Sequence, residues 1–436
     1  MTLKFEGDID VLVEPQKKLV ESVLQKQGYQ DGKVVVEPVG IKGDNFVAHV
    51  KRFIYEKSDG TTFKMVGKIA PVIEQQRLLM NTEVLFTNEI IMYSEVFPKF
   101  NDLQNSAGIT ENEKVKFPIC YGVFSEAPFE FILLEDLKES EFEMLDRLKP
   151  LDNESVRLVI KDLAIFHSLS YVIKNSEPET YKNISKKMVN MWTLMDVNPD
   201  TMQFFEMIEN ETVSMMQTEK HKKVIAGSVM QIAPTSRKLE SYEKESKYSV
   251  IQQGDCWNNN ILFRLEVKFG KSLIHFLNIE HNRVSILKFQ DGKAVQDVMI
   301  DYQLSREGNP AADILYLIFN CTDHSTRQKH YQEWIDYYHE VLDDSLSNHN
   351  LKANRIFPRE QLDADLQRYG KLLVGLSVIL SSILVRESKD TVDVRETTDA
   401  DAVAQMSTTT MDMSTIMRWK ERIEGLVNTT LEFGLV

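Results

Sequence analysis

The chain has 436 residues, of which 42% are hydrophobic and 27% are charged, and this composition is typical of a soluble globular protein. The length exceeds what one ordinary core holds and predicts two lobes that share a cleft. The net charge of -15 argues against nucleic acid or an anionic membrane as a partner, because either would need a basic surface. The three cysteines, Cys120, Cys256 and Cys321, suit neither a disulfide framework nor a metal site.

The sequence predicts neither secretion nor a membrane span. The N-terminus, M-T-L-K-F-E-G-D-I-D, lacks the apolar core of a signal peptide. The longest apolar run, residues 372–385, is too short to cross a bilayer and contains Gly375 and Ser377. We therefore expect a cytoplasmic protein, and the sequence assigns it no oligomeric state.

The first third of the chain combines one amphipathic helix with a strand-rich region. Apolar residues at helical spacing predict a helix over 9–27. A second helix follows the third strand and is predicted to end at Pro98. Alternating or apolar runs predict strands over 34–39, 47–55, 63–70, 115–124 and 129–134.

The rest of the chain is mainly helical. Residues 155–172 show a clear amphipathic pattern, and we interpret His167, on or beside its apolar stripe, as a packed core residue. Asp313 stands at the start of the buried run D-I-L-Y-L-I-F, where we predict that it caps a helix. Residues 387–413 are rich in Thr, Asp and Met without an apolar period and predict a mobile loop. Further helical patterns cover 173–248, 330–346, 368–385 and 413–433.

The most informative stretch runs from Ser249 to Phe263 and reads S-V-I-Q-Q-G-D-C-W-N-N-N-I-L-F. Two apolar runs flank a polar loop, which predicts a loop held between short strands. Asp255 and Asn260 have the separation that phosphoryl transfer uses. The Asp orients the acceptor hydroxyl and accepts its proton, while the Asn carbonyl holds a magnesium ion.

A second stretch, V-M-I-D-Y-Q, strengthens this interpretation. An apolar strand ends there in Asp301, which an aromatic residue follows. Kinases place their second metal-binding carboxylate at such a position. Taken alone, either motif describes an ordinary turn, but together and in this order they favour a kinase.

These motifs, with D-I-L-Y-L at 313–317, resemble the ecdysteroid-kinase-like family. That family belongs to the choline kinase and aminoglycoside phosphotransferase branch of the protein-kinase-like fold. The resemblance covers most of the chain and implies an α+β, two-lobed fold with an antiparallel-sheet N-lobe and a mainly helical C-lobe. We place the N-lobe at 1–135 and the C-lobe at 136–436. The resemblance also implies ATP-dependent phosphorylation of a hydroxyl on a small molecule, with ecdysteroids as namesake substrates.

The kinase layout assigns further residues to the ATP site. Lys68, on the strand over 63–70, would hold the phosphates. Glu89 would orient it, because F-T-N-E-I-I-M-Y matches the family's E-x-x-x-Y pattern. Lys64 and Glu83 are the alternatives to this pair. The turn G-I-K-G-D-N-F, with Gly43 and Asn45, resembles the family's phosphate-covering G-x-N-[FY] turn.

The N-lobe ends in L-L-E-D-L, which takes the place of the kinase hinge. There the main chain of Glu135 and Leu137 would bond the adenine edge.

The catalytic loop completes the predicted site. Asp255 is the predicted catalytic base, and Asn260 and Asp301 are the predicted magnesium ligands. The polar helical segment over 173–248 is expected to build the acceptor pocket.

Two features depart from the family pattern. Gln253 stands where the family has His two residues before the catalytic Asp, although a glutamine amide can still donate and accept hydrogen bonds. Residues 264–286 look inserted, either as a surface excursion or as a retained intron. The predicted protein is therefore a kinase acting on a lipophilic, ecdysteroid-like alcohol. The alternatives are a choline- or ethanolamine-type kinase and a catalytically degenerate binding protein.

Overall fold

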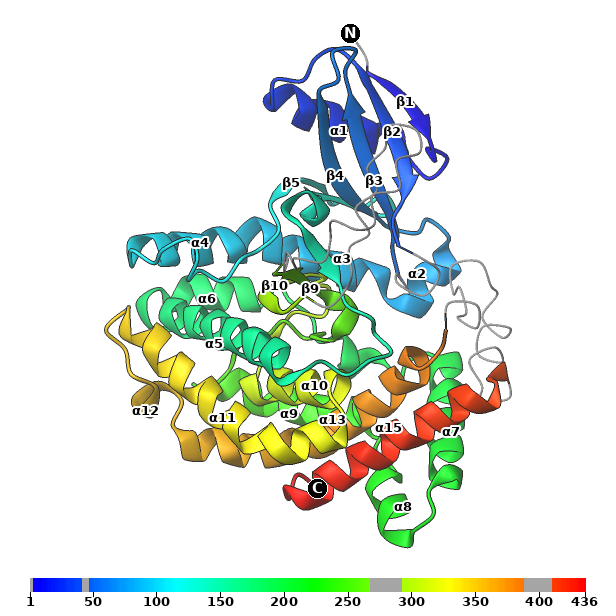
Figure 1. The fold of residues 1–436 in the computed structure, drawn as a ribbon, viewed down its shortest axis with the longest axis vertical. Helices are drawn as coiled ribbons and strands as arrows, with labels where there is room; N and C mark the ends of the chain where they lie inside the picture. The colour runs from blue at the N-terminus through cyan, green and yellow to red at the C-terminus, as the bar shows by residue number, and fades with distance from the viewer. Residues whose placement is uncertain (1–2, 41–46, 267–291, 388–409) are drawn as a thin grey trace, which may run out of the picture.

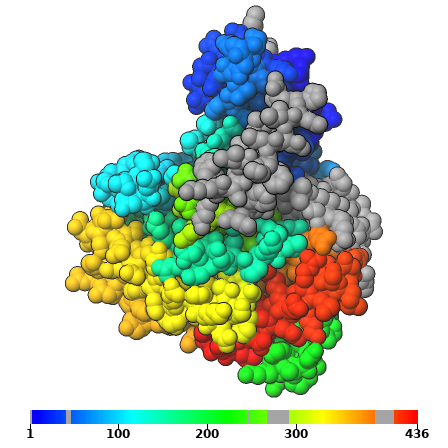
Figure 2. All heavy atoms as spheres, in the orientation of Figure 1, coloured from blue at the N-terminus to red at the C-terminus, as the bar shows by residue number. Residues whose placement is uncertain are grey.

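The computed structural model describes residues 3–40, 47–266, 292–387 and 410–436. One six-stranded sheet occupies the N-terminal part, and helices dominate the C-terminal part (Figure 1). Figure 2 shows the N-terminal residues, in blue, above a broader body whose lower edge is green and red, the colours of α8 and α15 in Figure 1. The fold is α+β, as predicted.

The sheet has the order β1-β2-β3-β4-β6-β5. Strands β1 and β2 pair in parallel, and the other neighbours pair antiparallel. Strand β1 was not predicted from the sequence, because only four residues form it. The strands are β1 (Lys4–Gly7), β2 (Lys33–Pro38), β3 (His49–Glu56), β4 (Thr62–Ile69), β5 (Cys120–Phe124) and β6 (Phe131–Glu135).

Helix α1 (Glu14–Lys26) covers one face of this sheet, where Val20 and Leu24 pack against the inward residues of the strands. Because side chains alternate along a strand, Met65 of β4 points into that core while Lys68 points to the opposite face. Gly67 shares the core face. A Cβ there would come within 2.5 Å of two aromatic rings, so the close packing requires glycine.

The helix predicted to end at Pro98 continues beyond it. The order is α2 (Glu74–Met80), α3 (Thr82–Ile91), a π-helical turn (Met92–Val96) and α4 (Phe97–Ser106). Pro98 lies in the first turn of α4, directly after the π-helical turn, in a helical path that runs on from α3. The predicted stop at Pro98 was therefore wrong. Proline is common both in the first turn of a helix and just after a helix ends, so the sequence alone does not distinguish the two positions.

The C-terminal part surrounds α5, which packs against α11 and β10. Asp152 caps α5 by accepting a hydrogen bond from Ser155 N at 2.8 Å. The helices are α5 (Asn153–Ser176), α6 (Pro178–Ser185), α7 (Pro199–Met215), α8 (Glu219–Ile225), α9 (Ile232–Glu245), α10 (Pro310–Cys321), α11 (His324–Ser347), α12 (Ala353–Ile356), α13 (Arg359–Leu384) and α15 (Met413–Glu432). None of the helices in the described ranges combines the length and apolar character needed to cross a membrane.

Two small sheets carry the functional loops. Strands β7 (Phe142–Met144), β9 (Ile261–Leu265) and β10 (Ala294–Met299) form one in the order β10-β9-β7. Strands β8 (Val250–Ile251) and β11 (Glu307–Gly308) form the other. Short 3-10 turns lie at Leu137–Ser140, Met191–Leu194 and Asn258–Asn260.

Two predicted features fall largely outside the described residues. The predicted insertion began at Arg264, but Arg264 and Leu265 belong to β9 and pair with β10, so its start was placed too early. The remainder, from residue 267, lies outside the described ranges, as does most of the predicted loop over 387–413. Both stay predictions.

Candidate active site

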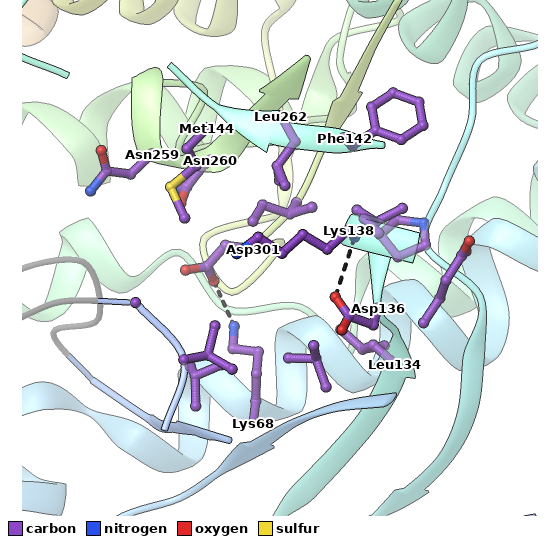
Figure 3. A pocket seen from close by; sticks show the side chains of 18 of the residues that line it. Lys68, Leu134, Asp136, Lys138, Phe142, Met144, Asn259, Asn260, Leu262 and Asp301 are labelled. Atoms are coloured by element: carbon purple, nitrogen blue, oxygen red, sulfur yellow. Dashed lines mark hydrogen bonds and ion pairs between the residues drawn. The ribbon is translucent and has the colours of Figure 1, made fainter. Parts of the chain in front are cut away.

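A cavity of about 390 Å³ lies between the large sheet and the β7-β9-β10 sheet. Figure 3 shows Leu262 and Phe142 on one side of it and Lys68 and Leu134 on the other. Apolar residues from both sheets supply much of its wall, and charged groups lie at its edge. A mixed apolar and charged lining of this kind is typical of a small-molecule site. The apolar wall comprises Val50, Val66, Leu134, Phe142, Met144, Leu262 and Ile300.

Lys68 joins the two halves of the site. Its Nζ donates to Asp301 Oδ1 at 2.7 Å (Figure 3) and also bonds Glu89 Oε2. Burial disfavours the charged ammonium, but the carboxylates of Asp301 and Glu89 outweigh burial and raise the pKa of Lys68. Burial also raises the pKa of Glu89 to about 7, although the charge of Lys68 lowers it. The lysine is therefore held as a cation at the edge of the cavity.

The alternative residues for this pair lie elsewhere. Lys64 donates to Glu139 at 2.7 Å at the far end of β4, and Glu83 is exposed on α3. The structure thus brings together Lys68 and Glu89, the pair chosen from the sequence. A spacing of four residues along β4 keeps Lys64 on the same face as Lys68 but moves it away from α3.

Asp255 lies next to the cavity-lining residue Asn260, and both of its carboxylate oxygens are hydrogen-bonded. Asn260 Nδ2 donates to Oδ2 at 2.8 Å, and the Tyr316 hydroxyl donates to Oδ1 at 2.8 Å. Burial and the charge of Asp301 raise the pKa of Asp255 to about 8, and the hydrogen bonds from Tyr316 and Asn260 oppose this rise. A carboxylate in this setting binds a proton more readily than one in water, which suits a general base.

Gln253 links the loop of Asp255 to the loop of Asp301. Its Oε1 accepts from Asp255 N at 2.6 Å, and its Nε2 donates to Ile300 O at 3.0 Å and Asp301 O at 3.3 Å. The carbonyl end of the amide therefore binds one loop while its NH₂ end binds the other. This arrangement agrees with the expectation that a glutamine can brace the loop in place of histidine.

Asp313 also supports this loop, and its predicted role as a helix cap was wrong. Asn309 caps α10 by accepting from Ala311 N at 2.9 Å. The carboxylate of Asp313 instead accepts from Gln253 N at 2.8 Å and Gly254 N at 3.0 Å. His167 bonds the same carboxylate at 3.1 Å and is fully buried, as expected for a core residue. Sequence position suggested the cap because Asp313 lies in the first turn of α10, four residues after the actual N-cap, Asn309.

Asp301 follows β10 with φ 59°, in the left-handed region that few residues other than glycine adopt. Ile300 N donates to Asn260 O at 2.9 Å, so the two predicted metal ligands are tied through the main chain. Asn260 turns its NH₂ toward Asp255, which leaves its carbonyl oxygen for the cavity that it lines. These two side chains offer the oxygen donors that magnesium prefers. Among the described residues, no group of three or more His, Cys, Asp or Glu could hold a metal.

The predicted hinge borders the cavity through Glu135 and Leu137. Between them, Asp136 is buried and accepts from Arg52 Nε at 2.6 Å, and both residues line the cavity. This ion pair was not predicted, because the two residues lie far apart in sequence. Gly43 and Asn45 lie outside the described residues, and the adjoining Gly40 borders the cavity.

A strand lysine paired with a helix glutamate, above a loop with an Asp and an Asn, is the arrangement of the protein-kinase-like fold. The chain belongs to the ecdysteroid kinase-like family, whose model matches residues 42–272 and 286–351. A search of curated proteins found no match.

Several solved structures show low similarity to this chain. One is the GDP complex of an aminoglycoside 2'-phosphotransferase-IIIa mutant, which has 12% sequence identity and a TM-score of 0.41. The match covers 94% of this chain and 96% of that chain. A microcompartment-associated aminopropanol kinase has 10% identity, a TM-score of 0.38 and coverage of 96% and 99%. The GDP complex of the wild-type phosphotransferase has 11% identity, a TM-score of 0.37 and coverage of 89% and 96%.

Proposed function

We propose that this protein is an ATP-dependent small-molecule kinase that transfers the γ-phosphate to a hydroxyl of a lipophilic alcohol, with an ecdysteroid-like steroid as the best candidate. Family membership supports a kinase with a small-molecule acceptor. The observation that carries the proposal is the contact of Lys68 with both Glu89 and Asp301 at the edge of the cavity. Together these three residues supply the kind of cation and carboxylate set that kinases use to bind nucleotide phosphates.

In this proposal Asp255 accepts the proton of the acceptor hydroxyl. The acceptor oxygen forms a bond to the γ-phosphorus, the bond from that phosphorus to the β-phosphate oxygen breaks, and ADP leaves. Lys68 binds the α- and β-phosphates, and the main chain at Glu135 and Leu137 bonds the adenine edge. Gly43 and Asn45 stay predicted contacts of the phosphates.

Asn260 and Asp301 are the proposed magnesium ligands. Their donor atoms are a carbonyl and a carboxylate oxygen, and the Asp301 side chain keeps 26% of its surface exposed although it pairs with Lys68. Magnesium would neutralise charge on the β- and γ-phosphates. The residues themselves orient the nucleotide, and Asn260 Nδ2 also donates to Asp255, so one proposed ligand contacts the base directly.

An apolar cluster beside the base supports a lipophilic acceptor. Leu304 packs tightly against Gly254, the residue before Asp255, where a Cβ would come within 2.3 Å of the Leu304 carbonyl oxygen. Leu304 in turn belongs to a cluster with Val47 and Leu85. Partly buried Met80, Met191 and Trp192 pack against this cluster. Among the described residues of this cluster, only the partly exposed Met80, Met191 and Trp192 would offer apolar surface near the base, and such surface favours an acceptor that is apolar around its hydroxyl.

The test is ATP turnover by the purified protein with magnesium, against ecdysone-type steroids, choline and ethanolamine. Steroid-dependent turnover supports the proposal, and turnover only with choline or ethanolamine would replace it with an amino-alcohol kinase. Asp255→Asn should lower turnover by about 10²–10⁴-fold while nucleotide binding persists. The matched control, Asp102→Asn, makes the same chemical change at an exposed position on α4 and should leave turnover unchanged. Full turnover by Asp255→Asn would contradict the assigned role of the base.

A further inference from the structure

Tyr316 contacts the proposed base although neither the kinase layout nor the sequence pattern assigned it a role. Its hydroxyl donates to Asp255 Oδ1 at 2.8 Å across 61 positions of the sequence. Tyr316 is 5% exposed and lies on α10, every residue of which is buried. A buried phenol normally finds a hydrogen-bond partner, so the contact needs an argument beyond proximity.

The first argument comes from how the carboxylate is fixed. Asn260 holds Oδ2 and Tyr316 holds Oδ1, so the two donors together set the plane of the Asp255 carboxylate. Without Tyr316, Oδ1 would lose this donor, and only Asn260 and a hydrogen bond from Trp257 would oppose rotation about the Cβ–Cγ bond. Each carboxylate oxygen can accept more than one hydrogen bond, so an acceptor hydroxyl can still be bound.

The second argument is that Tyr316 sits on a rigid support. Asn309 caps the start of α10, and Asp313, one turn before Tyr316, holds the main chain of the catalytic loop. At the other end of the helix, Arg327 donates to Thr322 O at 2.8 Å and to Phe319 O at 3.2 Å. A donor on such a helix keeps a constant position relative to Asp255.

We propose that Tyr316 is a positioning residue for phosphate transfer, whose hydroxyl holds the Asp255 carboxylate in the orientation that receives the proton of the acceptor hydroxyl. This inference rests on the proposed function. Tyr316 touches neither nucleotide nor acceptor in the proposal, so it acts only through Asp255. Its removal should therefore affect the transfer step and leave nucleotide binding unchanged.

The test is Tyr316→Phe, which deletes one oxygen, measured in both the wild-type and the Asp255→Asn backgrounds. In the wild-type background kcat should fall by about 10- to 100-fold, the loss expected for a hydrogen bond to a charged group. The KM for ATP should stay within about twofold. In the Asp255→Asn background the residual turnover should change little, because the group that Tyr316 positions is already gone.

Tyr369→Phe is the matched control, since Tyr369 is also a buried phenol that donates to a carboxylate, Glu243 Oε1, at 2.7 Å. It should leave kcat unchanged. If Tyr316→Phe does not fold, 4-fluorophenylalanine at position 316 keeps the volume and still removes the donor, and 3-fluorotyrosine should preserve kcat. A wild-type protein without turnover would overturn the proposed function and this inference with it. An active wild type would overturn the inference alone if Tyr316→Phe kept full kcat, or if the loss were equal in both backgrounds.

Discussion

Gln253 provides a test of how the catalytic loop is held, because its side chain makes three hydrogen bonds inside the site. Gln253→Met keeps the length of the side chain and removes both polar ends. Asp255 N and Ile300 O then lose their side-chain partner at a position where Gln253 itself is fully buried. A buried group left without a partner costs about 1–3 kcal/mol, so the free energy of unfolding should fall by roughly 2–4 kcal/mol.

The assay is urea unfolding followed by far-UV circular dichroism, together with magnesium-dependent nucleotide binding. The matched control is Gln104→Met, because buried Gln104 on α4 likewise bonds the main chain of Val115 at 3.2 Å and 2.8 Å. Both variants should lose stability, but only Gln253→Met should weaken nucleotide binding, since Gln253 also holds Asp301. A stability loss below about 0.5 kcal/mol for Gln253→Met, or equal nucleotide affinity in the two variants, would refute the reasoning.

Two further predictions concern buried charges. Lys68→Met should weaken binding of a fluorescent ATP analogue by at least about tenfold, because it removes the cation and leaves buried Glu89 without its partner. The control Lys64→Met should change binding by less than about twofold. Equal effects of the two variants would contradict the assignment of Lys68. Burial raises the pKa of Asp162 to about 7, so its contribution to stability is fully present below pH 4 and is lost as pH rises to 7. Asp297, which interacts with Asp162, also has a pKa that burial raises. Asp162→Asn should therefore reduce that slope and raise the free energy of unfolding at pH 7, whereas Asp102→Asn at an exposed site should do neither; a pH slope as steep in Asp162→Asn as in wild type would be inconsistent with this view.

The sequence predicted what short-range periodicity controls. The alternating run over 63–70 predicted the strand that carries Lys68, whereas the choice of Lys68 and Glu89 as a pair came from the resemblance to the kinase layout. The apolar runs around Asp255 correctly predicted short strands on both sides of its loop, and Asn260 lies against it there. These features depend on residues only a few positions apart, so a local pattern contains the necessary information.

Contacts that join distant segments could not be predicted in this way. The Arg52–Asp136 pair spans 84 positions, and Tyr316 reaches Asp255 across 61. A strand arginine and a helix tyrosine carry no local signal that distinguishes these contacts from ordinary surface and core positions. Asp313 shows the related problem, because an acidic residue in the first turn of a helix suits both a cap and a long-range acceptor. Only the three-dimensional arrangement decides between them.

Gln253 in place of histidine is weak evidence for a non-catalytic protein, because the geometry shows that the catalytic loop is still held. Two independent supports hold the loop: the carboxylate of Asp313 binds its main-chain N–H groups, and the Gln253 amide joins it to the segment of Asp301. Neither support requires a ring nitrogen. A glutamine amide also keeps the same donor and acceptor at every pH, whereas a histidine loses its acceptor when it is protonated. The substitution therefore removes a titrating group from the brace without removing the brace, and it does not by itself favour the degenerate alternative.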